Sequence, residues 1–294
     1  MEYTVKQISK SEYPSFTASA DLFAEKAFQK GCVFLAQTED GRPVGMLAAK
    51  PGVAVLHVSY IYVKPFRRNQ GIAKKLLQAL QESTSTAIRI CVREGHPCEQ
   101  ALQRLVQHFR MEEDDVIRSF ICGMEEPWAK ELHKKLWDER YERIFQRFFD
   151  RGYQLKSFEK SGKNIIHTLT ELVGEEFEYN TNPGMYSNVN REYSYCLFQN
   201  GVPKAFSLIE TKDGVAKMHL LSRARSSAPG SFLLPLVQSY TALQDAGYEK
   251  IVFIVYDNNT PMLSLLTDGF LKPYIAETKT QRYYIVNHFE RSEK

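Results

Sequence analysis

Residues 63–73 read VKPFRRNQGIA, and this short stretch joins two segments of opposite character. The segment before it, Val55–Val63, is rich in β-branched and aromatic residues, which predicts a strand. After Gly71 the apolar residues recur at helical spacing, at Ile72, Leu76, Leu77 and Leu80. The sequence therefore predicts a strand, a tight basic loop and an amphipathic helix in that order.

The start of this predicted helix has the properties of an anion site. The first turn of a helix has N–H groups without intrahelical partners, and the helix dipole adds partial positive charge there. Gly71 lets a ligand approach the backbone closely, and the small Ala73 does nearly the same. The basic loop before them adds charge, so the junction predicts a pyrophosphate site. The plainer interpretation is a strand-turn-helix corner whose basic residues serve solubility.

The loop also resembles a known family motif. Arg68–Ala73 fits the R/Q-x-x-G-x-G/A motif of the GCN5-related N-acetyltransferases (GNAT), and Val63–Arg68 fits the V-x-P-x-x-R lead into it. The resemblance implies acetyl-CoA as cosubstrate. In such a site the backbone of Ile61, Tyr62 and Val63 would pair with the pantetheine arm. The pyrophosphate would be held by the motif itself, Arg68, Asn69, Gln70, Gly71, Ile72 and Ala73.

Composition predicts an ordinary globular protein with room for two domains. The chain has 294 residues, of which 43% are hydrophobic and 25% charged, and its net charge is +3. This charge is too small to indicate a nucleic-acid partner. The N-terminus lacks an apolar leader, and no run approaches the ~20 apolar residues of a membrane span, so we expect a cytoplasmic protein without a membrane partner.

The cysteines do not predict a disulfide framework or a metal site. There are five, an odd number, and none forms a CxxC pair, so reduced thiols are expected. Cys91, His96 and Cys98 bring three possible ligands together, but the fourth ligand that zinc needs is missing. We therefore expect no metal.

The order of predicted elements in the first half recurs in the second. This repeat predicts an α/β (α+β) fold of two tandem acyl-CoA N-acyltransferase-like domains, each with a mixed, mostly antiparallel sheet flanked by helices. The boundaries follow from composition: a first domain at 1–124, an amphipathic helical connector at 125–150, and a second domain at 151–294. Asn200-Gly201 marks a hairpin in the second domain, and residues 275–280 and 282–286 predict a closing hairpin.

The second half keeps a different part of the family pattern. Laying Leu76-Leu77 on Leu233-Leu234 places Arg225, Ala228 and Gly230 in the motif positions, and Pro229 lacks an N–H for phosphate. The stretch from Asn258 to Met262, followed by Asp268-Gly269-Phe270, resembles the family's later signature beside pantetheine, which the first half lacks. Because charge and backbone donors gather in the first half, we expect the cofactor there, and whether the second domain also binds coenzyme A stays open.

The family resemblance implies direct transfer of acetyl to an amine, without a covalent acyl-enzyme. Many members place a carboxylate base on the long strand, where this chain offers His57, Ser59 and Tyr60 instead; we predict His57 and Tyr60 as catalytic, with a water-relayed base as the alternative. The usual acid, a tyrosine, falls near Leu105 and Leu266, which are apolar. Either another tyrosine substitutes, or the thiolate leaves unassisted, or catalysis is inefficient.

Two functions follow from this pattern. The first is an N-acetyltransferase acting on a small-molecule or amino-acid-derived amine, with a longer acyl chain as a remote variant. The alternative is a catalytically degenerate module that binds coenzyme A and serves regulation or interaction. Since two fused copies already supply a pseudo-dimer, we expect a monomer or a weak homodimer.

Overall fold

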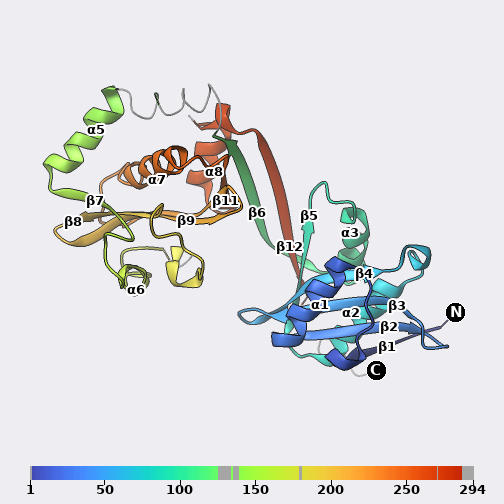
Figure 1. Ribbon diagram of the computed structural model, residues 1–294. Helices are drawn as coiled ribbons and strands as arrows, with labels where there is room; N and C mark the ends of the chain where they lie inside the picture. Colours follow the sequence, from blue (N-terminus) through green and yellow to red (C-terminus); the bar gives the residue numbers. More distant parts are fainter. Residues whose placement is uncertain (1, 125–133, 135–138, 179–180, 270, 287–294) are drawn as a thin grey trace. The chain divides into compact units, whose positions relative to one another are not determined.

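The computed structural model describes residues 2–124, 134, 139–178, 181–269 and 271–286 (Figure 1). The chain forms two compact units: unit 1 comprises Met1–Val116 and Thr280–Lys294, and unit 2 comprises Ile117–Lys279. In each unit helices flank a mixed, mostly antiparallel sheet, which confirms the predicted fold class.

Unit 1 has the strand order β1-β2-β3-β4-β5-β12. Alternating strand residues point to opposite faces, so α1 covers one face of the sheet through its small alanines while α2 buries its leucine stripe against the other. The described elements are β1 Tyr3–Ile8, a 3₁₀ turn at Lys10–Glu12, α1 Ala18–Lys30, β2 Cys32–Thr38, β3 Pro43–Pro51, β4 Val55–Val63, a 3₁₀ turn at Pro65–Arg67, α2 Ile72–Ser83, β5 Ala87–Arg93 and α3 Glu99–His108.

Unit 2 has the strand order β6-β11-β10-β9-β8-β7. The aromatic side chains of α5 join its core, whereas the rest of the predicted connector, apart from Lys134, lies outside the described residues. The elements are β6 Glu112–Gly123, α5 Glu139–Asp150, β7 Tyr153–Ser157, α6 Ile165–Glu171, a 3₁₀ turn at Pro183–Met185, β8 Tyr195–Gln199, β9 Val202–Lys212, β10 Val215–Arg223, α7 Leu233–Asp245, β11 Lys250–Tyr256, α8 Thr260–Thr267, a 3₁₀ turn at Lys272–Tyr274 and β12 Glu277–Val286.

Each unit is completed by a strand from the other half of the sequence. Strand β12 pairs antiparallel with β5 of unit 1, from Gln281↔Arg93 to Val286↔Ile88. Strand β6 pairs antiparallel with β11 of unit 2, from Lys250↔Gly123 to Tyr256↔Ile117. The predicted closing hairpin was therefore wrong, because residues 277–286 form one continuous strand. For the same reason the units differ from the boundaries expected at residues 124 and 151.

The long strand of each unit has the same irregularity. Both β4 and β10 are nine residues long and pair antiparallel with the preceding strand. The register of β4 shifts so that Ser59 has no partner, and the register of β10 shifts in the same way at His219. A residue left unpaired in this manner is a β-bulge, which bends the strand and redirects its side chains. The internal repeat thus extends to single-residue detail, with an offset of 160 residues between the two strands.

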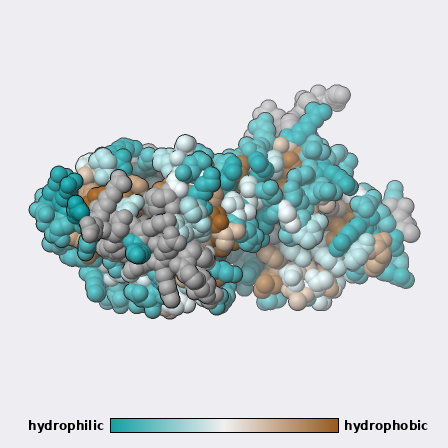
Figure 2. All heavy atoms as spheres, turned by 90° about the horizontal axis from the view of Figure 1, so that it is seen from above, coloured by the Kyte–Doolittle hydropathy of each residue, from teal (hydrophilic) through white to brown (hydrophobic). Residues whose placement is uncertain are grey.

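The face drawn in Figure 2 is largely hydrophilic, with small scattered apolar areas rather than one broad patch. Among the described residues, every helix is too short or too polar to cross a bilayer.

The exchange of strands makes a testable contribution to stability. Val286 is only 4% exposed and packs in the core of unit 1. Replacing it with alanine, V286A, should lower the free energy of unfolding by about 1 to 3 kcal/mol, because a cavity opens in a packed core. The neighbouring Arg282 pairs with Glu113 at the surface, so R282A should cost less than about 1 kcal/mol. Urea denaturation followed by circular dichroism measures both; equal, negligible effects would contradict the packing of β12.

Candidate functional site

The candidate site of unit 1 is a slot between β4 and β5. These parallel strands pair over only three positions, from Val55↔Ala87 to His57↔Arg89. Beyond His57 the two strands separate, so the edge of β4 from Val58 to Val63 has no ladder partner on that side. Unpaired strand edges offer N–H and C=O groups to an extended ligand, which can add to the sheet as a short strand.

The bulge residue lies where the slot begins to open. The hydroxyl oxygen of Ser59 is buried and has no hydrogen-bond partner among the described residues. A buried polar atom without a partner is uncommon and costs free energy, so it indicates that a missing partner belongs there. Sequence reasoning named Ser59 but did not identify this feature, because a bulge is visible only in the pairing register.

A cradle of free backbone donors follows directly after β4. The first bond of α2 runs from the N–H of Lys75 to the carbonyl of Gly71 (3.0 Å). The six amides before it, Asn69 to Lys74, donate to no acceptor within the described residues. Two left-handed backbone conformations, at Asn69 (φ 61°) and Gly71 (φ 77°), turn the loop sharply before the helix begins. A helix N-terminus with several free N–H groups is a site for phosphate.

The cradle is also open and positively charged. A Cβ built on Gly71 would meet no atom within 4 Å, so space lies in front of the backbone at this point. The segment 64–75 contains five cationic side chains and no carboxylate, at Lys64, Arg67, Arg68, Lys74 and Lys75. Charge and free amides therefore favour an anionic ligand with more than one negative group.

The predicted cofactor residues fall into two groups in this arrangement. Ile61, Tyr62 and Val63 form the end of β4 beside the slot, and Arg68 to Ala73 form the cradle. Several side chains in the cradle are already engaged: Gln70 accepts a hydrogen bond from the Tyr3 hydroxyl, and the Arg68 Nε donates to the Val63 carbonyl (3.2 Å). Ile72 is buried in the core. The loop would therefore bind phosphate chiefly through its backbone, and its side chains hold that backbone in place.

His57 lies at the closed end of the slot. Its ring packs against Gly52, where an added Cβ would come within 2.4 Å of Nε2. Burial lowers the pKa of His57 below the ordinary 6.5, and the positive charges of Arg89 and Lys50 lower it further, while Asp114 acts in the opposite direction. The ring is therefore neutral at pH 7 and able to accept a proton.

Tyr60, the other predicted catalytic residue, is part of an aromatic wall on the α1 side of the sheet. Its ring stacks on Phe23 with centroids 4.8 Å apart. Tyr62 meets Phe16 edge to face at 5.4 Å. The face of β4 that carries these rings also carries His57, because the bulge at Ser59 resets the alternation. The structure thus brings His57 and Tyr60 to one side of β4.

Other predicted features lie away from this site. Leu105 on α3 is 9% exposed, so an apolar residue does occupy the position of the usual acid. Cys91, His96 and Cys98 gather no metal set, since the described residues contain no cluster of three such ligands. In the second half, Asn259 caps α8 by accepting from the Met262 N–H (3.2 Å), whereas Phe270 lies outside the described residues.

The equivalent loop of unit 2 is already occupied by protein atoms. Glu176 accepts hydrogen bonds at its carboxylate from the hydroxyl (2.5 Å) and the N–H (3.4 Å) of Ser226, and its backbone carbonyl accepts from the N–H of Arg225 (2.8 Å). The Arg225 guanidinium donates to the carbonyl of Gly174 (3.2 Å). A resident carboxylate and satisfied amides therefore replace the open, cationic cradle of unit 1.

The elements also give a different correspondence between the two loops from the one predicted. Helix α2 begins at Ile72 after Gly71, whereas α7 begins at Leu233 after Phe232. Phe232, rather than Ala228, thus takes the place of Gly71 at the start of the helix. The predicted alignment was shifted because the leucine pairs of the two helices occupy different turns.

Comparisons with known proteins agree with this geometry. The model of the acetyltransferase (GNAT) family matches residues 3–96. A GCN5-related glucosamine N-acetyltransferase region of a fungal multi-domain GH3 β-N-acetylglucosaminidase is similar in structure, with a TM-score of 0.66 and 12% identity. That match covers 97% of this chain, which spans 38% of the fungal chain. No curated protein sequence matches significantly.

Two further structures have the same arrangement. A tandem GNAT protein from the clavulanic acid biosynthesis pathway, solved without AcCoA, has a TM-score of 0.59 and 12% identity over 99% of this chain and 100% of its own. A GCN5-related N-acetyltransferase from Sphaerobacter thermophilus has a TM-score of 0.55 and 14% identity over 87% of this chain and 81% of its own. Residues 3–96 therefore belong to the acetyltransferase (GNAT) family, and the whole chain has the tandem two-domain GNAT fold.

The contrast between the two loops predicts a contrast between two matched substitutions. Gly71 and Gly230 both have left-handed backbones, with φ of 77° and 81°, and both face open space. The backbone strain of G71E and G230E is therefore similar, at about 1 kcal/mol. Only G71E places a carboxylate before the open cradle, so it should abolish acetyl-CoA binding in calorimetric titration while G230E leaves it largely intact. Equal loss in both would sink the assignment to unit 1.

Proposed function

We propose that the protein is an N-acetyltransferase that binds acetyl-CoA in unit 1 and transfers its acetyl group to the amine of a small-molecule or amino-acid-derived acceptor. The observation that carries this proposal is the six consecutive free amides at the start of α2, placed directly beside an unpaired strand edge. Coenzyme A combines a pyrophosphate with an extended chain of amides, so it matches both features at once.

The residues present fit this cosubstrate. The free N–H groups of Asn69 to Lys74 would hold the pyrophosphate, and the unpaired edge of β4 from Val58 to Val63 would bind the amide chain. Gly71 leaves the approach open. The cosubstrate supplies an activated acetyl group, and the chain's own residues hold it in the slot and handle protons.

His57 is the base in this proposal. An alkyl amine is mostly protonated at neutral pH and must lose a proton before it can attack a carbonyl. The lowered pKa keeps His57 neutral and ready to accept that proton, directly or through one water. Tyr60 contributes a wall for the acceptor in this arrangement, since its ring is held by Phe23.

Ser59 is the donor that the described site offers to the thioester region. Its buried hydroxyl lacks a partner at the mouth of the slot, and a hydroxyl can donate one hydrogen bond to a developing negative charge. This role would compensate in part for the apolar residue at Leu105, where the family's tyrosine would lie. The alternative function, a coenzyme-binding module without turnover, is favoured by that same missing tyrosine.

Stoichiometry and turnover together test the proposed function. Calorimetric titration of the full chain with acetyl-CoA should give one equivalent per chain, because only unit 1 has the open cradle. A panel of amines should then release free coenzyme A thiol. Tight binding without thiol release from any amine would favour the regulatory module, and no binding would overturn both functions. Gel filtration of the same sample should show a monomer or a weak homodimer.

The assignment of His57 predicts a particular pH profile. H57Q keeps a neutral side chain of similar size but removes the base, so kcat should fall by about 10²- to 10⁴-fold while acetyl-CoA affinity stays unchanged. In the wild type the unprotonated form is active. Since the pKa lies below 6.5, kcat/KM should stay level from pH 8 down to about 6.5 and fall as the solution becomes more acidic. The matched variant Y60F keeps the ring stack; a loss as large as that of H57Q would instead make Tyr60 the base.

A further inference from the structure

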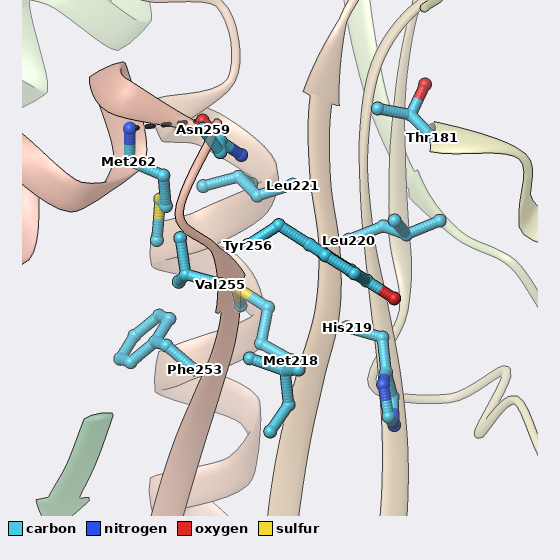
Figure 3. A pocket seen from close by; sticks show the side chains of 11 residues that line it. Thr181, Met218, His219, Leu220, Leu221, Phe253, Val255, Tyr256, Asn259 and Met262 are labelled. Atoms are coloured by element: carbon cyan, nitrogen blue, oxygen red, sulfur yellow. Dashed lines mark hydrogen bonds between the residues drawn. The ribbon is translucent and has the colours of Figure 1, made fainter. Parts of the chain in front are cut away.

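Unit 2 contains a slot of its own. Strands β10 and β11 pair in parallel from Val215↔Lys250 to Met218↔Phe253 and then separate. A narrow cavity of about 40 Å³ lies at this separation, lined by side chains of both strands and of the start of α8 (Figure 3). Its lining is mostly apolar, and its polar members are Thr181, His219, Tyr256 and Asn259.

The cavity has a polar end built around the bulge residue of β10. The Nε2 of His219 lies 3.0 Å from a carboxylate oxygen of Glu210 on β9, and the Tyr186 ring packs on the imidazole at 4.9 Å. Figure 3 shows the Tyr256 side chain extending from the end of β11 toward the β10 side of the cavity. When His219 donates its Nε2–H to Glu210, its Nδ1 is left to accept a hydrogen bond from a ligand.

The charges around this slot select against an anionic ligand. Hydrogen bonds from His219 and Asn188 lower the pKa of Glu210 against the opposing effect of burial, so this carboxylate is ionised at neutral pH. At the other end, Glu176 already occupies the loop before α7. Pro229 and Pro235 contribute no N–H groups to that loop. A nucleotide pyrophosphate would therefore meet carboxylates at both ends and few free amides.

We propose that the slot between β10 and β11 is a second ligand site, which takes an extended, phosphate-free chain bearing secondary amides, with the His219–Glu210 pair at its polar end. The unpaired edges of both strands satisfy the amide groups of such a chain as an added strand would. The apolar walls contact its methylene groups, and Nδ1 of His219 accepts from an amide or hydroxyl of the ligand. Pantetheine without its nucleotide is a probe with this chemistry.

Hydrogen–deuterium exchange of the full chain, read by peptide, tests the proposal because it reports the two units separately. With reduced D-pantetheine, peptides covering 218–223 and 254–262 should become protected. With coenzyme A, protection should appear at 58–75 and be absent at 218–223. Protection by coenzyme A at 218–223 would overturn the exclusion of phosphate, and absence of protection there by pantetheine would overturn the site. Either result is independent of acetyl transfer in unit 1.

Two variants and a matched control test the polar end. H219A removes the acceptor and should weaken pantetheine protection about 3- to 10-fold in half-maximal concentration, the equivalent of one hydrogen bond. E210Q retains a hydrogen-bonding partner and tests the charge. The control, H167A, removes a histidine that also pairs with a glutamate, Glu171, but on the exposed surface of α6. Thermal melting confirms that each variant is folded. Unchanged protection in H219A, or equal loss in H167A, would contradict the proposed site.

Discussion

Backbone polar groups without internal partners are the constraint on which the site of this protein depends. A folded chain satisfies nearly all of its buried N–H and C=O groups, and groups left over must face water or a ligand. In unit 1 the leftover groups are concentrated in one place, because β4 leaves its parallel partner after His57 and α2 starts after a sharp turn at Gly71. The unpaired strand edge and the free helix start thus form one continuous row of donors and acceptors.

The same architecture has been used differently in unit 2. Its long strand repeats the bulge and the separation, yet the loop that follows is closed by Glu176 and by amides bonded within the protein. The difference does not depend on the fold, since the two units share it. It depends on a few side chains that either leave backbone donors free or satisfy them. One fold can therefore offer an anion site in one copy and refuse it in the other.

Local features were predictable from the sequence, and those that depend on distant pairing were not. The strand ending at Val63, the helix beginning near Gly71 and the tandem repeat all follow from periodicity and composition within short windows. The closing hairpin was wrong because a turn signal near residue 281 was inferred from residue types alone, whereas β12 pairs with β5 almost 200 residues earlier. The unpartnered Ser59 and the carboxylate of Glu176 likewise depend on contacts that no window contains.

The exchanged strands also determine when each unit can finish folding. Unit 1 starts at the N-terminus, but its sheet is completed only by residues 281–286, near the end of the chain. During synthesis the edge of β5 stays unpaired until almost the whole protein has been made, and exposed strand edges are prone to pair with other chains. Contacts so distant in sequence also slow folding through the entropy of closing long loops. A fragment that ends near residue 124 would keep the cradle at Gly71 but lack the strand that covers β5, so the two halves of this sequence are not independent folding units.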